Sequence, residues 1–109
     1  MLSIIVPTYN EEDVIDEFYS RITTVLDAMS HKHELIFIND GSNDTTLERL
    51  NTYHSSGANV VVIDFSRNFG KEAAMTAGID YARGDAVVVI DADLQDPPEV
   101  IPMLVDKWN

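Results

Sequence analysis

The sequence has no cysteine and no long hydrophobic run, and each absence excludes a class of protein. Without cysteine the chain can hold no disulfide framework, no thiolate metal site and no cysteine nucleophile. The longest uninterrupted apolar run, residues 86–90, is far shorter than the ~20 residues of a membrane-spanning helix. Residues 1–9 also lack the basic start and the apolar length of a signal peptide. We therefore expect a soluble chain.

Basic charge is scarce as well. Seven Lys and Arg residues stand against nineteen Asp and Glu residues, which gives a formal net charge of −12 at pH 7. A domain that binds a nucleic-acid duplex needs a basic surface to displace counterions, so this class of function is disfavoured. An anionic ligand would have to overcome the negative field, and a divalent cation would help because it inverts the local charge.

Two kinds of segment alternate over the 109 residues, which are enough for one domain. Short runs rich in β-branched residues predict strands at residues 2–7, 35–38, 60–63 and 86–90. The runs are continuous, which is typical of strands that are buried on both faces of a parallel sheet. The segments between them have helical spacing, so the order predicts an α/β fold with a parallel, doubly wound sheet and helices on both faces.

Residue types at the predicted helix ends indicate where the helices begin and stop. Asn10 is a candidate cap for the first helix. Two further helices are predicted over about residues 44–55 and 70–83, and Gly84 is a candidate stop for the later one. The segment Asp96-Pro97-Pro98-Glu99 has the order of cap, proline and acid that is typical of a helix start.

Polar residues gather at the predicted carboxyl ends of the strands. They are Thr8, Tyr9, Asn10, Glu11 and Glu12 after the first strand, Asn39 and Asp40 after the second, Ser66, Arg67 and Asn68 after the third, and Asp91, Asp93, Gln95 and Asp96 after the fourth. In a parallel sheet these ends lie along one edge, which is where such sheets bind ligands. We therefore expect these side chains to form one site.

Asp91-Ala92-Asp93 is the candidate metal site. Two carboxylates two positions apart at a strand end can lean toward one point, and Mg²⁺ or Mn²⁺ favours such oxygen ligands. Gln95 adds a neutral oxygen nearby. Taken alone, the spacing fits an ordinary turn better, because Asp is common in turns. The polar residues at the neighbouring strand ends shift the balance toward a metal–diphosphate site.

The first two strand ends offer contacts for a nucleoside, and each contact has a plain structural alternative. Asp40 could accept hydrogen bonds from a base or a ribose, or it could form an ordinary Asx-turn. Tyr9 could stack on a base or pack against the sheet edge. Glu11 could hold a hydroxyl group or merely favour a helix N-terminus. Neither a Walker loop nor G-x-G-x-x-G is present, which disfavours a Rossmann dehydrogenase.

Arg67 and Lys71 are two of only seven basic residues, and both follow the third predicted strand. They could meet a phosphate group, with Gly70 opening a helix whose N-terminus favours anions. An ion pair with the surrounding acidic residues is an equally good interpretation of the same two side chains.

Four motifs in this order resemble the family 2 glycosyltransferases of the GT-A fold. They are I-V-P-T-Y-N-E-E, N-D-G-S, S-R-N-F-G-K-E-A-A and D-A-D-L-Q-D-P-P-E, and together they extend over the whole chain. The last two are most similar to the branch that glycosylates polyprenyl phosphates. That branch includes bactoprenol glucosyltransferases and dolichol-phosphate mannose synthases.

The resemblance implies a role for each matching residue. The nucleoside pocket would be lined by Pro7, Tyr9, Glu11, Ile38 and Asp40. The metal on the donor diphosphate, Mg²⁺ or Mn²⁺, would be held by Asp91, Asp93 and Gln95, with Ala92 beside it and the two aspartates as the catalytic residues. Arg67 and Lys71 would lie near donor or acceptor phosphates. The family often has Asp-Asp where this chain has Asn39-Asp40, and we expect altered base contacts from this departure.

The resemblance also implies the reaction, which is inverting transfer of a hexose from a nucleotide sugar to a polyprenyl phosphate. Glucose is the favoured sugar, with UDP-glucose as its donor, and GDP-mannose is the alternative donor. Relatives of this branch carry a second half with the acceptor site and usually membrane helices. We therefore expect residues 1–109 to be the donor-binding, N-terminal part of a longer protein on the cytoplasmic side of the membrane. An apolar stripe that still runs at Trp108 fits this expectation and leaves a homo-oligomer open.

Two other classes of function fit parts of the sequence. A receiver-type phosphoacceptor domain would match the length, the acidity and the α/β order, but it needs a Lys at the end of a late strand, and no predicted strand ends in Lys. A non-catalytic nucleotide-binding or assembly module would use the apolar last helix as its contact surface.

Overall fold

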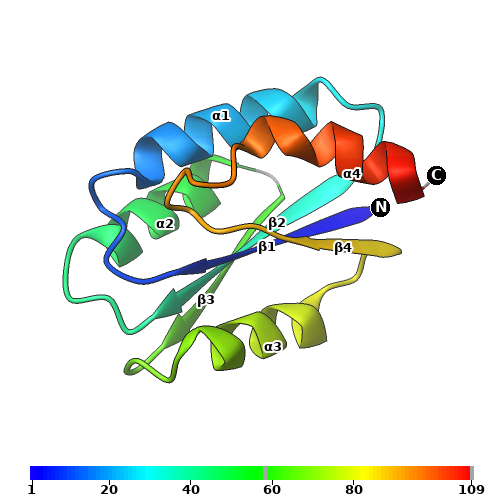
Figure 1. The fold of residues 1–109 in the computed structure, drawn as a ribbon. Coiled ribbons are helices and arrows are strands. Elements are labelled where there is room, and N and C mark those ends of the chain that lie inside the picture. Colours follow the sequence, from blue (N-terminus) through cyan, green and yellow to red (C-terminus); the bar gives the residue numbers. More distant parts are fainter. Residues whose placement is uncertain (58, 109) are drawn as a thin grey trace.

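The computed structural model describes residues 1–57 and 59–108, with side chains at residues 1–57 and 59–106. Strands and helices alternate along the chain, as the sequence predicts (Figure 1). In order they are β1 (Leu2–Thr8), α1 (Ile15–Asp27), β2 (His33–Asp40), α2 (Thr46–Ser56), β3 (Val60–Phe65), α3 (Lys71–Tyr81), β4 (Ala86–Val89), the 3-10 turn η1 (Pro98–Val100) and α4 (Ile101–Trp108).

The strands form one parallel sheet in the order β3-β2-β1-β4, which confirms the predicted α/β fold. Ile5 at the centre of β1 pairs with Ile36 of β2 on one side and with Val89 of β4 on the other. The chain builds outward from β1 to β3 and then returns to place β4 on the free side of β1. The strand order therefore reverses at β1, and in such sheets the crevice at this reversal is the usual ligand site.

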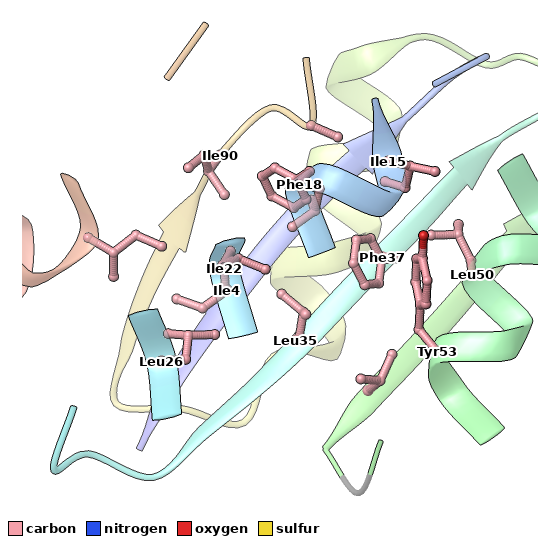
Figure 2. Close-up of a cluster of buried hydrophobic side chains, with 14 of the residues drawn as sticks. Ile4, Ile15, Phe18, Ile22, Leu26, Leu35, Phe37, Leu50, Tyr53 and Ile90 are labelled. Atoms are coloured by element: carbon pink, nitrogen blue, oxygen red, sulfur yellow. The ribbon is translucent and has the colours of Figure 1, made fainter. Parts of the chain in front are cut away.

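The larger core lies between the sheet and the helices α1, α2 and α4, which cover the same face (Figure 1). Figure 2 shows Phe18 of α1 and both Leu50 and Tyr53 of α2 around Phe37 of β2. The Phe18 and Phe37 rings meet edge to face with centroids 6.5 Å apart. Each fully buried side chain of this kind contributes about 1.5–3 kcal/mol. This core supports the sheet beneath the loops at its carboxyl edge.

Of the described helices, only α3 covers the other face of the sheet (Figure 1). Gly78 lets this helix approach closely, since a Cβ at that position would lie 2.5 Å from Ile5 Cγ2. Helix α3 does not cover the edge strand β4, where Val87 and Val89 stay 42% and 37% exposed. The predicted burial on both faces is therefore wrong for β4, although it holds for β1 and β2.

The predicted helix caps at Asn10 and Asp96 are wrong, although the segment that Asp96 opens does begin a helical turn, at Pro98. Helix α1 begins only at Ile15, because Asn10 has a φ of 52° and uses its Oδ1 to accept a hydrogen bond from the backbone N–H of Asn43 (2.7 Å). The last helix opens with η1, which has no capping hydrogen bond from a side chain. The Val100 N–H there closes a 3-10 turn on a proline carbonyl instead (3.0 Å).

The predicted helix stop at Gly84 is also wrong, since α3 ends at Tyr81. Gly84 serves a close approach, because a Cβ there would lie 2.6 Å from Ser3 Oγ. Its N–H donates to Ser3 Oγ (2.8 Å), and the Ser3 hydroxyl donates to the buried carboxylate of Glu34 (2.6 Å). The Arg83 N–H donates to the same carboxylate (2.7 Å). This network ties the α3–β4 connection to the amino-terminal ends of β1 and β2.

The predicted apolar stripe of the last helix is partly buried. Ile101 and Val105 pack into the larger core, whereas Leu104 is exposed. The side chain of Trp108 lies outside the described residues. Within the described ranges, no helix is long and apolar enough to cross a membrane.

Candidate functional site

A cavity of about 220 Å³ opens at the carboxyl ends of the strands, on the side of the sheet where β1 adjoins β4. Its lining comes from the end of β1, the end of β2, the start of α3 and the segment after β4. The lining residues are Pro7, Thr8, Tyr9, Glu11, Asp40, Lys71, Asp91 and Asp93. The structure thus brings together residues from the ends of the first, second and fourth predicted strands, with Lys71, which follows the third.

Hydrogen bonds join the loop after β1 to the loop after β2. The Asn10 N–H donates to Ser42 Oγ (3.0 Å), and the Asn43 N–H donates back to Asn10 Oδ1 (2.7 Å). Thr8 at the end of β1 donates its hydroxyl to the Ile38 carbonyl of the neighbouring strand (2.8 Å). These bonds hold the loop that carries Tyr9, a residue that lines the cavity and is 42% exposed.

A second set of hydrogen bonds continues this contact between the two loops. The Glu11 N–H donates to Thr46 Oγ1 (2.9 Å), and the Glu12 N–H donates to Asp44 Oδ2 (3.2 Å). Thr45 donates its N–H and its hydroxyl to Glu12 Oε2 (3.1 and 2.7 Å). Burial acts to raise the pKa of Asp44, but hydrogen bonds from Thr46 and Glu12 outweigh it and leave that pKa below its ordinary value.

Asn10, Glu11 and Glu12 were expected in the site, but their hydrogen bonds to the loop after β2 were missed. The partners in that loop were missed as well; they hold the site without lining the cavity, and they are Ser42, Asp44, Thr45 and Thr46. A signal was present in the run Ser-Asn-Asp-Thr-Thr at residues 42–46, because these residue types bond to nearby backbone groups and favour turns. The sequence could not show that the partner groups lie on the loop after β1.

Asp40 is buried and has both carboxylate oxygens engaged by the loop before α3. The Phe69 N–H donates to Oδ1 (2.7 Å) and the Gly70 N–H donates to Oδ2 (3.1 Å). Gly41 follows with a φ of 72°, and a Cβ there would collide with the backbone of Arg67 and Asn68. Asp40 therefore shapes the loop that presents α3, and it still lines the cavity. Its predicted contact with a nucleoside stays a prediction.

Lys71 and Asp91 form an ion pair across the cavity, with Nζ and Oδ2 2.8 Å apart. Lys71 is the first residue of α3, and Asp91 follows β4. The hydrogen bond to Asp91 raises the pKa of Lys71 most, and the charges of Asp91, Asp93 and Asp96 raise it further against a smaller effect of burial. The ion pair that the sequence offered as an alternative for Lys71 is thus present.

The carboxylates around the cavity repel one another. Burial raises the pKa of Glu11, and the negative charges of Asp93, Asp91 and Asp44 raise it further. Among the lining residues that the structure describes, there are four carboxylates and one ammonium group, that of Lys71. A cavity with this charge favours a cation.

Asp91 and Asp93 fit a hard divalent ion that shares its coordination with a ligand. Among the described residues, no three His, Cys, Asp or Glu side chains are grouped so as to hold a metal ion by themselves. Mg²⁺ usually takes only one or two carboxylates and completes its shell with phosphate and water oxygens. Asp91 already attracts one cation, the ammonium group of Lys71. The donor set therefore suits a metal–phosphate ligand.

The remaining predicted site residues lie apart from the cavity. Gln95 is not among its lining residues, and its N–H donates to Asp93 Oδ1 (3.1 Å). Ala92 is buried between the two aspartates. Ile38 is buried under α3 and lines no part of this cavity. The metal-binding and nucleoside roles of these residues stay predictions.

Arg67 lies in a neighbouring hollow of about 430 Å³ at the ends of β2 and β3. Its guanidinium stands over the Phe69 ring, 4.5 Å from the centroid. Tyr9 lines both this hollow and the cavity, so the two spaces adjoin at its ring. The structure thus separates Arg67 from Lys71, which the sequence analysis had grouped as phosphate contacts.

Comparison with known proteins identifies similar chains. The sequence profile described as Glycosyl transferase family 2 matches residues 3–109. The uncharacterized glycosyltransferase YkcC of Bacillus subtilis is 55% identical over 107 residues, which are 98% of this chain and 33% of that protein. The prophage bactoprenol glucosyl transferase homolog of Escherichia coli is 49% identical over 108 residues, which are 99% of this chain and 35% of that protein. The chain thus spans about a third of the length of these curated relatives.

A solved structure agrees in fold. The mannosyltransferase PcManGT from Pyrobaculum calidifontis, in complex with GDP-Man and Mn²⁺, matches with a TM-score of 0.82 at 27% sequence identity. The match covers 98% of this chain and 31% of that one. The similarity therefore extends over nearly all of the sheet and its helices.

Proposed function

The chain belongs to Glycosyl transferase family 2, and we propose that it is the donor-binding part of an enzyme that transfers a hexose to a polyprenyl phosphate. Glucose is the favoured sugar, because the E. coli relative is named a bactoprenol glucosyl transferase homolog. The chain spans about a third of such relatives, so the activity is proposed for a longer protein. The family match over residues 3–109 speaks against a receiver-type module.

The observation that carries the proposal is the acidic cavity at the strand reversal, where Lys71 is the one cation among the described lining residues. We propose that a nucleoside diphosphate sugar binds there, with its base on the exposed ring of Tyr9 and its nucleoside near Glu11 and Asp40. Arg67 would reach the donor from the adjoining hollow. UDP-glucose is the favoured donor and GDP-mannose the alternative.

Asp91 and Asp93, with Gln95, would hold Mg²⁺ or Mn²⁺ on the donor diphosphate. The solved mannosyltransferase of similar fold contains Mn²⁺ together with GDP-Man, which supports this assignment. When bound, the metal supplies a Lewis acid for the charge on the leaving diphosphate. The four lining carboxylates would otherwise repel that charge, and Lys71 alone offsets only part of it.

The proposed reaction is an inverting displacement. An oxygen of the polyprenyl phosphate attacks the anomeric carbon, and the bond from that carbon to the diphosphate breaks. A phosphate monoester is already ionised near neutral pH, so the site needs no strong general base. A lipid acceptor implies that the full-length protein works at a membrane, and we propose its cytoplasmic side.

Asp93→Ala tests the metal assignment. We expect nucleotide binding in the presence of Mn²⁺, measured by calorimetry with UDP-glucose, to weaken at least about tenfold, as is typical when a metal site is impaired. Asp80→Ala removes an exposed acidic residue of α3 that lines no part of the cavity and should leave binding unchanged. Equal affinities of Asp93→Ala and the wild-type chain would refute the metal role.

A further inference from the structure

Lys71 forms an ion pair with Asp91, which is also a proposed metal ligand. Its Nζ lies 2.8 Å from Asp91 Oδ2, and the two side chains are 59% and 32% exposed. Asp91 is the least exposed of the three proposed metal ligands. An ammonium group at this distance competes with a metal ion for Oδ2, because both cations are attracted to the same carboxylate.

The ion pair between Lys71 and Asp91 can break so that each group binds another partner. A solvent-exposed ion pair stabilises little, because water screens the charges and two side chains must be held in one geometry. A lysine ammonium is a compact charge on a flexible four-carbon stem, so it can leave one anion and reach another. Lys71 is also the first residue of α3, and the N-terminus of a helix favours a phosphate, because the first backbone N–H groups have no partner within the helix.

We propose that Lys71 acts as a tethered cation that holds Asp91 in the absence of donor, yields it to the metal ion, and then binds the donor diphosphate. The inference rests on the proposed function. It adds a coupling between the binding of the metal ion and the binding of the nucleotide. A metal ion that binds alone displaces Lys71 from Asp91 and leaves it without a new partner, whereas the nucleotide supplies that partner. Each ligand should therefore raise the affinity for the other, by equal factors.

The displacement can be observed on the lysine itself. The chain has three lysines, so an NMR spectrum of the 15N-labelled side-chain ammonium groups is simple, and exposed Lys32 is an internal control. We expect saturating Mg²⁺ alone to shift or broaden the Lys71 signal while Lys32 is unchanged. Addition of UDP should then restore a sharp signal at a new position. If Mg²⁺ binds and the Lys71 signal does not change, the exchange is refuted and the proposed metal site stands.

Affinities measured on variants give the second readout. Lys71→Gln should bind Mn²⁺ alone up to about fivefold more tightly, because the competing ion pair is gone, and it should bind UDP in the presence of Mn²⁺ more weakly. Lys32→Gln removes the same charge far from the cavity and should change neither affinity. Equal tightening of Mn²⁺ binding in both variants would assign the effect to net charge and overturn the exchange. If the wild-type chain binds neither Mn²⁺ nor UDP, the proposed donor site fails, and the exchange fails with it.

Discussion

At the scale of single residues, the Asp40 carboxylate combines two tasks. It lines the cavity, and it accepts the N–H groups of Phe69 and Gly70 at 2.7 and 3.1 Å. The loop before α3, and with it the position of Lys71, therefore depends on a side chain at the end of β2. A nucleoside bound at Asp40 would meet a group whose orientation is already fixed.

Asp40→Asn should loosen that loop. Asparagine keeps one acceptor oxygen but turns an NH₂ group toward one of the two N–H donors, and a buried donor without a partner costs about 1–3 kcal/mol. We expect the free energy of unfolding in urea to fall by that amount and the Phe69 and Gly70 amides to exchange faster with solvent. Asp80→Asn, at an exposed position of α3, is the control. Unchanged amide protection in Asp40→Asn would contradict the assigned role.

Glu34 makes stability depend on pH at the opposite end of the sheet. Burial acts to raise its pKa, but the hydrogen bonds from the Arg83 N–H and the Ser3 hydroxyl, with the charge of Arg83, leave that pKa below its ordinary value. A lowered pKa in the folded state stabilises the fold above the unfolded pKa of ~4.3 and loses this effect as the pH falls through the folded value. The gain is therefore present at neutral pH and lost in acid.

Glu34→Gln keeps an acceptor for these donors and cannot titrate. The free energy of unfolding, followed from about pH 5 to about pH 3, should fall less steeply in this variant than in the wild-type chain. Glu48→Gln, at an exposed position of α2, should keep the wild-type slope. If Glu34→Gln and the wild-type chain lose stability in parallel, the pKa of Glu34 is not lowered by folding.

Residue types at strand ends were enough to predict most of the cavity lining, because parallel strands bring their carboxyl ends to one edge. Tyr9, Asp40 and Asp91 were found in this way. The hydrogen bonds from Phe69 and Gly70 to Asp40 were not predictable, since they depend on the path of the loop between β3 and α3. Lys71 was left with two interpretations, because its ion pair depends on the distance between α3 and the end of β4.

At the scale of elements, the strands were predictable and the helix ends were not. Continuous β-branched runs were enough to locate the strands, although they overstated the burial of β4. A helix cap, in contrast, depends on which of several possible partners binds the polar side chain. Asn10 bonds to Asn43 on another loop and leaves α1 to begin at Ile15. Gly84 accommodates Ser3 rather than ending α3. In both cases a tertiary contact outweighs the local signal.

Gly78 tests how tightly α3 packs on the sheet. A Cβ at this position would lie 2.5 Å from Ile5 Cγ2 and 2.9 Å from Ile38 Cδ1. Overpacking costs about 1–3 kcal/mol, which exceeds or offsets the ~1 kcal/mol that alanine gains over glycine inside a helix. We expect Gly78→Ala to lower the free energy of unfolding in urea. Thr76→Ala, at an exposed position of the same helix, should not lower it; a more stable Gly78→Ala variant would show that α3 can move outward freely.

At the scale of the whole molecule, charge and topology point to the same edge of the sheet. The chain carries a net charge of −12, and the strand order reverses where the acidic cavity opens. The long-range field therefore opposes a nucleoside diphosphate that arrives alone. A divalent cation that arrives with the nucleotide changes the sign of the local field, so binding should require both.

Thermal unfolding should reveal this requirement directly. A ligand at a hundred times its dissociation constant stabilises the folded state by about 2.7 kcal/mol, which raises the Tm of a domain of this size by on the order of 10 °C. We expect such a rise with UDP-glucose and Mn²⁺ together, and little change with UDP-glucose in EDTA or with Mn²⁺ and uridine, which lacks the diphosphate. GDP-mannose in place of UDP-glucose compares the two candidate donors. An equal rise in EDTA would mean that the carboxylates around the cavity bind the donor without a metal ion, and the roles assigned to Asp91 and Asp93 would be wrong.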